Sequence, residues 1–105
     1  MENAAVSKFL VFLRDVNNED SFSPELIEEL TKGHVDHLRD LDSKGALFLC
    51  GPLKDREEGM LILCAKTYDE AESYVKKDPF IVNRCYKSYD ICEIVEANSS
   101  NNYLL

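Results

Sequence analysis

The chain has 105 residues, 45% of them hydrophobic, and a formal net charge of −8. This length fits one domain, and the hydrophobic content is typical of a folded chain and too high for a disordered one. Because an acidic surface repels phosphate, we expect neither nucleic-acid binding nor attachment to an anionic membrane.

The sequence gives no sign of a membrane span or of export. No apolar run approaches the ~20 residues that a bilayer requires, and residues 1–5 lack the basic start of a secretory signal. The cysteines show no CxxC spacing, so we expect a cytoplasmic protein in which they are reduced and mostly packed in the core. They are Cys50, Cys64, Cys85 and Cys92.

The first predicted element is a strand over residues 8–14, an apolar run with charged ends that favours burial on both faces. Residues 15–23 are polar and turn-forming and predict a loop. A helix over residues 24–44 follows, because Ser23 is a good N-cap and Pro24 fits the first helical position. Gly45 suits the residue that follows the end of a helix.

The middle of the chain predicts a hairpin. Residues 46–50 form an apolar run that indicates a second buried strand, with Gly51-Pro52 at its end. Residues 60–65 form a third apolar run after a short polar link, which predicts an antiparallel partner.

The last third predicts a helix, a strand and a tail. Thr67 and Glu70 fit a capping box for a helix over residues 68–77. Residues 86–96 alternate loosely and predict the fourth strand. We therefore expect one domain over residues 1–97 and a flexible tail over residues 98–105.

The element order is β-α-β-β-α-β, which predicts an α+β, ferredoxin-like fold. In that fold a four-stranded antiparallel sheet carries both helices on one face. Because the first three strands are apolar on both faces, the other face would expose a large apolar patch. Packing two such sheets face to face in a homodimer covers the patch and encloses a cavity suited to a ligand.

His34 is the first candidate for chemistry. It lies in the middle of the apolar stripe of the first helix, so its ring is either a satisfied core histidine or part of a site. His34 and His37 form an HxxH pair, but the sequence offers no third ligand, and we expect no metal.

Asp78 is the second candidate. Pro79 holds it out of the helical region, which suits the N-cap of a short turn over residues 79–81. It also suits a partner for His34, since an aspartate that accepts from one imidazole nitrogen fixes the tautomer and supports proton transfer at the other. Both interpretations stay open.

These residues belong to a longer pattern. The chain resembles the YCII-related (YciI-like) family over roughly residues 8 to 96, through a first-helix histidine, a glycine eleven residues on, a Gly-Pro pair after the second strand and an Asp-Pro-Phe after the second helix. The matching residues are the stretch from His34 to Leu41, then Gly45, Gly51-Pro52-Leu53, Gly59, Glu70-Ala71 and Asp78-Pro79-Phe80.

The resemblance implies a dimeric α/β barrel, similar in build to muconolactone isomerase, with His34 and Asp78 as the active-site pair. Some members of the family are dehydrochlorinases of chlorinated aromatic diols, and most have no assigned reaction, so it implies no substrate. The chain departs from the pattern in a long acidic loop at residues 15–23, in His37 where an aromatic ring is commoner, and in an insert at Glu57-Glu58.

Further candidates for ligand binding surround this pair. Arg14 ends the first strand and either neutralises an anionic ligand group or is an ordinary charged strand end. Gly51 and Pro52 are expected to shape the rim of the cavity, and His37 and Phe80 complete the set. A nucleophilic role for Cys50 is not expected, because nothing in its surroundings lowers a thiol pKa.

Three functions fit these observations. The first is an enzyme of isomerase or lyase type that uses His34 and Asp78 as general acid/base, with no cofactor, since the chain has no glycine-rich phosphate loop. The second is a non-catalytic module that binds or senses a small molecule. The third is a dimerisation scaffold with a filled interior.

Overall fold

The computed structural model describes residues 6–17 and 22–105, so residues 1–5 and part of the predicted loop lie outside the described residues. The expected order of strands and helices is present, with one short helix added between the second helix and the fourth strand. The elements are β1 (Ser7–Val16), α1 (Pro24–Ser43), β2 (Leu47–Pro52), β3 (Gly59–Ala65), α2 (Tyr68–Lys76), α3 (Pro79–Val82) and β4 (Tyr86–Ile94).

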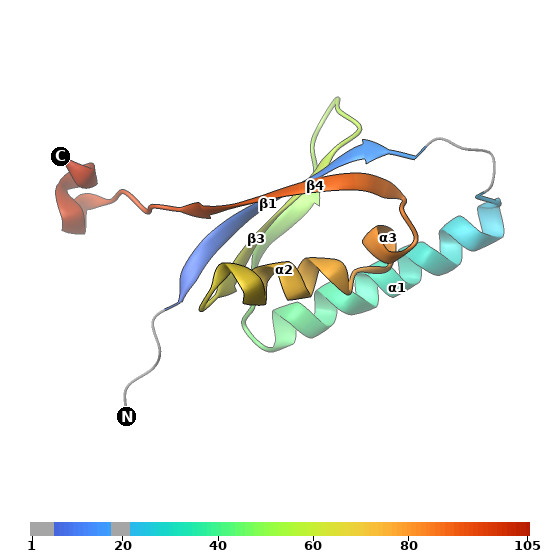
Figure 1. Cartoon of the computed structure of the whole chain (residues 1–105), viewed down its shortest axis with the longest axis horizontal. Helices are drawn as coiled ribbons and strands as arrows, with labels where there is room; N and C mark the ends of the chain where they lie inside the picture. The colour runs from blue at the N-terminus through green and yellow to red at the C-terminus, as the bar shows by residue number, and fades with distance from the viewer. Residues whose placement is uncertain (1–5, 18–21) are drawn as a thin grey trace.

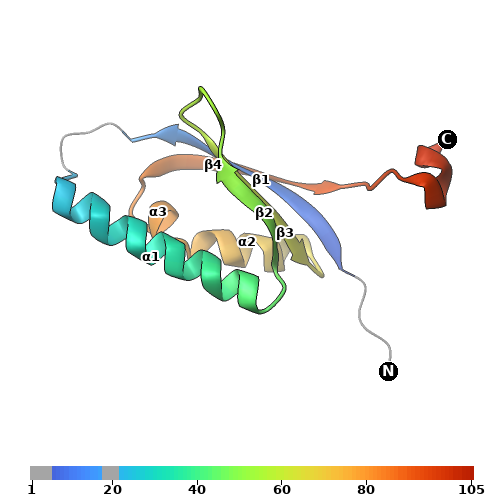
Figure 2. The same ribbon diagram turned by 180° about the vertical axis from the view of Figure 1, so that it is seen from behind.

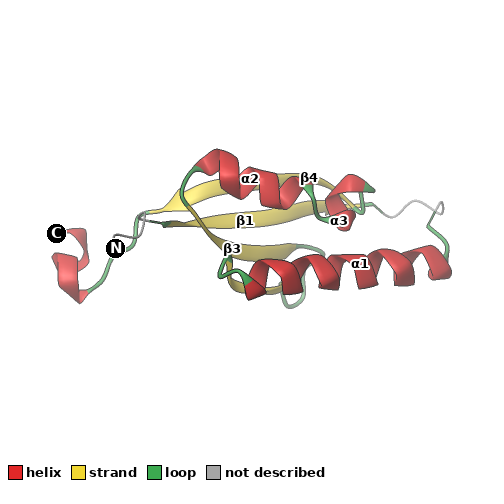
Figure 3. Cartoon of the chain, turned by 90° about the horizontal axis from the view of Figure 1, so that it is seen from below, coloured by secondary structure: helices red, strands yellow, loops and turns green. Residues whose placement is uncertain are grey.

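The four strands form one antiparallel sheet in the order β2-β3-β1-β4. All three helices lie on the same side of it (Figure 1), with α1 and α2 side by side as two parallel rows (Figure 3). This confirms the α+β, ferredoxin-like prediction. Within the described part of the chain, no helix is long and apolar enough to cross a bilayer.

The core lies between the sheet and the helices. Alternate residues of β1, namely Phe9, Val11 and Leu13, are buried on the helix side, as the two-residue period of a strand requires. Leu10 and Phe12 point to the opposite face and are only partly buried. The predicted burial on both faces is therefore present on one face, and no described residue covers the apolar side chains of the other face.

The second strand differs most from its prediction. It is the edge of the sheet and carries a bulge between Leu47 and Leu49, so Phe48 and Leu49 stay 61% and 52% exposed where a buried strand was expected. Gly51 and Pro52 lie inside the strand and pair with β3. An edge strand tolerates the proline because its missing N–H has no ladder partner to lose.

The helix ends follow the predicted signals. Ser23 accepts a hydrogen bond from the Leu26 N–H at 3.1 Å and begins α1. Gly45, with φ of +76°, turns the chain into β2 after α1 ends. Thr67 caps α2, but the Glu70 carboxylate accepts from the backbone N–H of Lys66 at 2.7 Å, one residue before the cap.

The C-terminal segment leaves the domain after β4. Residues Ser99–Leu104 form a short 3-10 helical segment whose cap is Asn98. The segment lies beyond the end of the sheet, away from the helices (Figure 2). Its predicted flexibility stays a prediction.

Candidate active site

The Asp-Pro-Phe motif folds into the start of α3. Asp78 has the extended backbone that its proline neighbour imposes (φ −68°, ψ 125°), and its Oδ1 accepts from the Phe80 N–H at 2.9 Å. The residue is only 2% exposed, and Asp78 is the one charged residue that is fully buried in the described part of the chain. The capping interpretation of Asp78 is thus correct.

The same carboxylate also contacts His34, so the predicted contact between the two residues is present, while its role in proton transfer stays a prediction. Nδ1 of His34 lies 2.9 Å from Oδ1 and 2.8 Å from Oδ2 of Asp78. A carboxylate only accepts hydrogen bonds, so Nδ1 carries a proton, and in the neutral ring Nε2 then presents its lone pair. Nε2 makes no hydrogen bond with any residue that the structure describes.

Packing holds the imidazole in this orientation. The ring stacks on Phe80, with ring centroids 4.1 Å apart and an angle of 12° between the planes. One residue before His34, Gly33 faces Pro79 so closely that an added Cβ would lie 3.1 Å from its Cγ. The glycine inside α1 therefore permits the close approach of α3 that brings Asp78 to His34.

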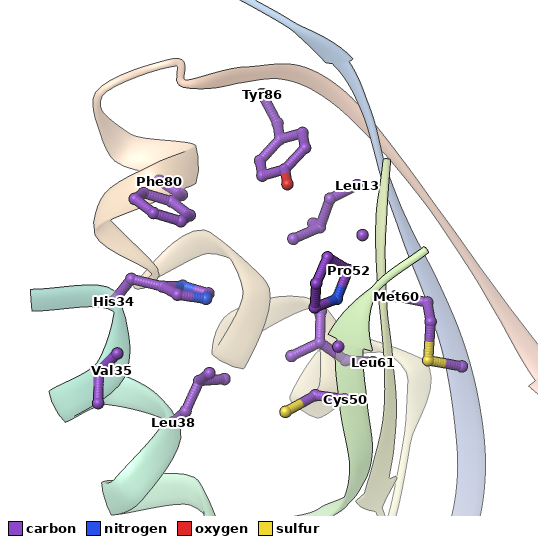
Figure 4. Close-up of a pocket in the computed structure, with 12 residues that line it drawn as sticks. Leu13, His34, Val35, Leu38, Cys50, Pro52, Met60, Leu61, Phe80 and Tyr86 are labelled. Carbon is purple, nitrogen blue, oxygen red and sulfur yellow. The ribbon is translucent and has the colours of Figure 1, made fainter. Parts of the chain in front are cut away.

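The pair lies at the wall of a pocket of about 350 Å³ between α1, α3 and the sheet. His34 enters it from α1 and Phe80 from α3, while Gly51 and Pro52 line it from β2 (Figure 4). Most of the remaining wall is aliphatic, and none of the described Lys, Arg, Asp or Glu side chains lines it. The pocket thus offers an apolar space with a bare imidazole nitrogen.

This location differs from the expected one. The pocket is formed by one chain on the helix side of the sheet, whereas the sequence led us to expect a cavity between two sheets. The reason is that α1 contacts the sheet mainly near β2 and leaves a space beside α3, a feature of three-dimensional packing.

Arg14 lies outside this pocket. Strand alternation turns Leu13 toward the pocket and Arg14 to the opposite face of the sheet. There Arg14 forms ion pairs with Asp90, 2.6 Å from Nε but without hydrogen-bond alignment, and with Glu58, 3.4 Å from Nη1. It therefore does not meet a ligand in this pocket.

His37 also lies outside the pocket. Its Nε2 is 2.8 Å from the backbone carbonyl oxygen of Tyr74, to which it donates, and this bond joins α1 to α2. The HxxH pair is thus divided between two different partners. In keeping with this, no cluster of three or more metal-ligating side chains exists among the described residues.

All four cysteines are free, but the expected core positions are only partly correct. Cys92 is exposed on β4, because it faces the uncovered side of the sheet, and the others are half-buried. Cys50 lines the pocket. Burial and, to a lesser extent, the charge of Asp42 raise the pKa of the Cys50 thiol, which disfavours the nucleophilic thiolate.

The sequence analysis did not single out Tyr86, and it named Gly59 only as part of the family pattern; both residues line the pocket. Tyr86 begins β4, where an aromatic residue is typical of any strand. Gly59 follows the polar hairpin link and resembles an ordinary turn glycine. The signal that could have located Tyr86 was its spacing from Asp78. A one-turn helix after the Asp-Pro-Phe motif brings the chain back to the wall of the same pocket.

Comparisons with known proteins support this fold. The family model for the YCII-related domain matches residues 8–95. No curated protein sequence matches the chain. A similar solved structure is 5-chloro-2-hydroxyhydroquinone dehydrochlorinase (TftG) from Burkholderia phenoliruptrix AC1100 in complex with 2,5-dihydroxybenzoquinone, with a TM-score of 0.66 and 22% identity over 90% of this chain and 99% of that chain. At this identity the likeness shows a shared fold.

Proposed function

Because the chain belongs to the YCII-related domain family, we propose that it is a small-molecule enzyme of isomerase or lyase type in which His34 and Asp78 act as a general acid/base pair. One observation carries the proposal. Asp78 holds Nδ1 of His34 at 2.8 Å, and Nε2 of a pocket-lining ring has no hydrogen-bond partner among the described residues. A fixed tautomer with a bare nitrogen at a cavity wall is the arrangement that a general base requires.

The two residues have different roles in the proposed reaction. Nε2 of His34 takes a proton from the substrate, and the Asp78 carboxylate stabilises the imidazolium that results. The same nitrogen then returns the proton at another position in an isomerisation. In an elimination, a leaving group departs from the substrate instead.

The pocket suits a compact and mostly apolar substrate. A volume of about 350 Å³ is near the lower end of ligand sites. The described residues that line the pocket include no charged side chain, and the buried carboxylate behind His34 disfavours an anionic ligand. The dehydrochlorinase of similar fold acts on a small hydroxylated ring, and we propose a cyclic or phenolic compound as the substrate class here.

We also propose that the chain works as a homodimer. The sheet face opposite the helices carries partly buried or exposed apolar side chains that none of the described residues covers, and a second copy would bury them. They include Leu10, Phe12, Phe48, Leu49 and Ile62. Ile62→Asp should reduce the sedimenting mass from twice that of the chain to that of one chain. Lys32→Asp, on the exposed side of α1, should leave it unchanged.

The catalytic proposal is tested with a panel of hydroxylated and halogenated ring compounds. Conversion is followed by nuclear magnetic resonance in heavy water, which also detects exchange of the abstracted proton. We expect turnover that His34→Gln abolishes and that Lys32→Gln keeps, because Lys32 is exposed on the same helix. Equal rates in wild type and His34→Gln would refute the proposal. Ligand-dependent thermal stabilisation without conversion would instead support the binding module.

A further inference from the structure

Gly59 indicates that the pocket contains a second polar group. The residue is buried at the start of β3 and does not adopt a backbone conformation that only glycine favours. A Cβ added there would lie 3.3 Å from the hydroxyl oxygen of Tyr86, closer than most Cβ contacts, and 3.8 Å from Leu13. The glycine at this position thus makes room for the Tyr86 hydroxyl.

That hydroxyl is free to bind a ligand. Tyr86 begins β4 and lines the same pocket as His34. Figure 4 shows its hydroxyl pointing into the pocket, toward the space that the His34 ring also enters. The hydroxyl makes no hydrogen bond with any of the described residues, whereas the hydroxyl of Tyr89 on the same strand donates to Glu72 at 2.8 Å.

The surroundings keep this hydroxyl protonated. Burial, and after it the negative charge of Asp78, raise the pKa of Tyr86 above its ordinary value. The group is therefore a hydrogen-bond donor at neutral pH. Its neighbour Phe80, whose ring is tilted by 58° with ring centroids 6.1 Å apart, helps to fix the Tyr86 ring at the wall.

We propose that Tyr86 is a second catalytic residue, whose hydroxyl donates a hydrogen bond to the substrate oxygen on which negative charge develops when His34 takes the proton. This inference rests on the proposed function. Gly59 is a positioning residue that keeps space for the hydroxyl. The substrate must then carry an oxygen conjugated to the acidic position, as phenols, enols and cyclic enones do.

The step is balanced in atoms and charge. A substrate C–H or O–H bond breaks, an N–H bond forms at Nε2 of His34, and the electron pair moves onto the conjugated oxygen without oxidation or reduction. The new imidazolium and the Asp78 carboxylate then sum to zero charge. The oxyanion therefore meets a neutral pair on one side and a hydrogen-bond donor, Tyr86, on the other.

The test compares Tyr86→Phe with Tyr89→Phe, which deletes the same atom from the same strand outside the pocket. The first readout is binding of 4-nitrophenol, followed by its absorbance at neutral pH. We expect wild type and Tyr89→Phe to bind equally, and Tyr86→Phe to bind ~10-fold more weakly, as loss of one hydrogen bond from a buried site predicts. Equal binding by Tyr86→Phe, or no binding by wild type, would overturn the inference.

The second readout is turnover of any compound that the panel identifies. Tyr86→Phe should lower kcat ~100-fold with a small change in KM, because the donor acts on charge that develops in the transition state. His34-dependent turnover that survives in Tyr86→Phe would refute the inference and leave the proposed function standing. Tyr86-dependent binding without His34-dependent turnover would refute the proposed function and leave Tyr86 as a ligand-binding donor.

Discussion

Replacing Asp78 by asparagine is predicted to reverse the tautomer of His34 while the fold survives. Oδ1 of Asp78 accepts the Phe80 N–H at 2.9 Å, and Oδ2 lies 2.8 Å from Nδ1 of His34. An asparagine has one oxygen, and capping α3 fixes it at the Oδ1 position. The amide nitrogen then faces Nδ1 and donates to it, so the imidazole proton moves to Nε2 and the base is lost.

The expected magnitudes follow from the bonds that are lost. Asp78→Asn exchanges a charge-assisted hydrogen bond for a neutral one and should lower the free energy of unfolding by about 1 kcal/mol. Asp78→Ala removes the cap and the His34 partner together, which should cost about 3 kcal/mol. In Tm these losses correspond to about 5 °C and about 15 °C for a domain of this size.

Turnover should fall ~10⁴-fold in Asp78→Asn, the size of effect known for a reversed tautomer in another His-Asp enzyme. The tautomer itself is read from the imidazole ¹⁵N shifts, and stability from urea unfolding. Asp36→Asn, at an exposed position of α1, is the control and should change neither. A proton that stays on Nδ1 in Asp78→Asn, or that lies on Nε2 in wild type, would refute the reasoning.

Three further predictions concern the frame around the site. Gly33→Ala should gain ~1 kcal/mol of helix propensity, but the added Cβ would press on Pro79 at 3.1 Å. Turnover should therefore fall more than stability, and undiminished turnover would contradict the argument from this close contact. His37→Ala should lower the free energy of unfolding in urea by ~1 kcal/mol, because α1 loses its hydrogen bond to the Tyr74 carbonyl of α2. Unchanged stability would count against that hydrogen bond. Burial, the hydrogen bond to Glu72 and the charge of Glu72 raise the pKa of Tyr89 to about 12. The contribution of this group to the free energy of unfolding is therefore complete below its ordinary pKa of 10.0, and it is lost as the pH rises through about 12. Glu72→Gln should lower that pKa in an absorbance titration of tyrosinate, and a titration curve identical to wild type would show that Glu72 does not contribute.

Local patterns predicted the elements well because the signals are local. Ser23, Thr67 and Gly45 act at the helix ends where their residue types place them. The boundaries moved where strand pairing decided them. Pairing with β4 extends β1 to Val16, and pairing with β3 carries β2 through Pro52. Such pairing depends on residues far away in the sequence, so no local pattern contains it.

The site was predictable in its chemistry and less so in its position. The contact between His34 and Asp78 was expected from their types and from the family resemblance, and the structure contains it; their catalytic role stays a prediction. The position of Arg14 was predictable in principle, because strand alternation places it opposite the buried Leu13. The position of Tyr86 in the pocket was not predictable, since the space for its hydroxyl depends on the absence of a side chain at Gly59 on another strand.

The pocket is built entirely from one chain, on the side of the sheet away from the surface proposed to join two copies. A dimer assembled through that surface would contain two complete pockets, each independent of the other. A mixed dimer of one wild-type and one His34→Gln subunit should then keep half of the activity of the wild-type dimer. The surface proposed to join the subunits and the walls of the pocket could accordingly change by mutation without changing one another.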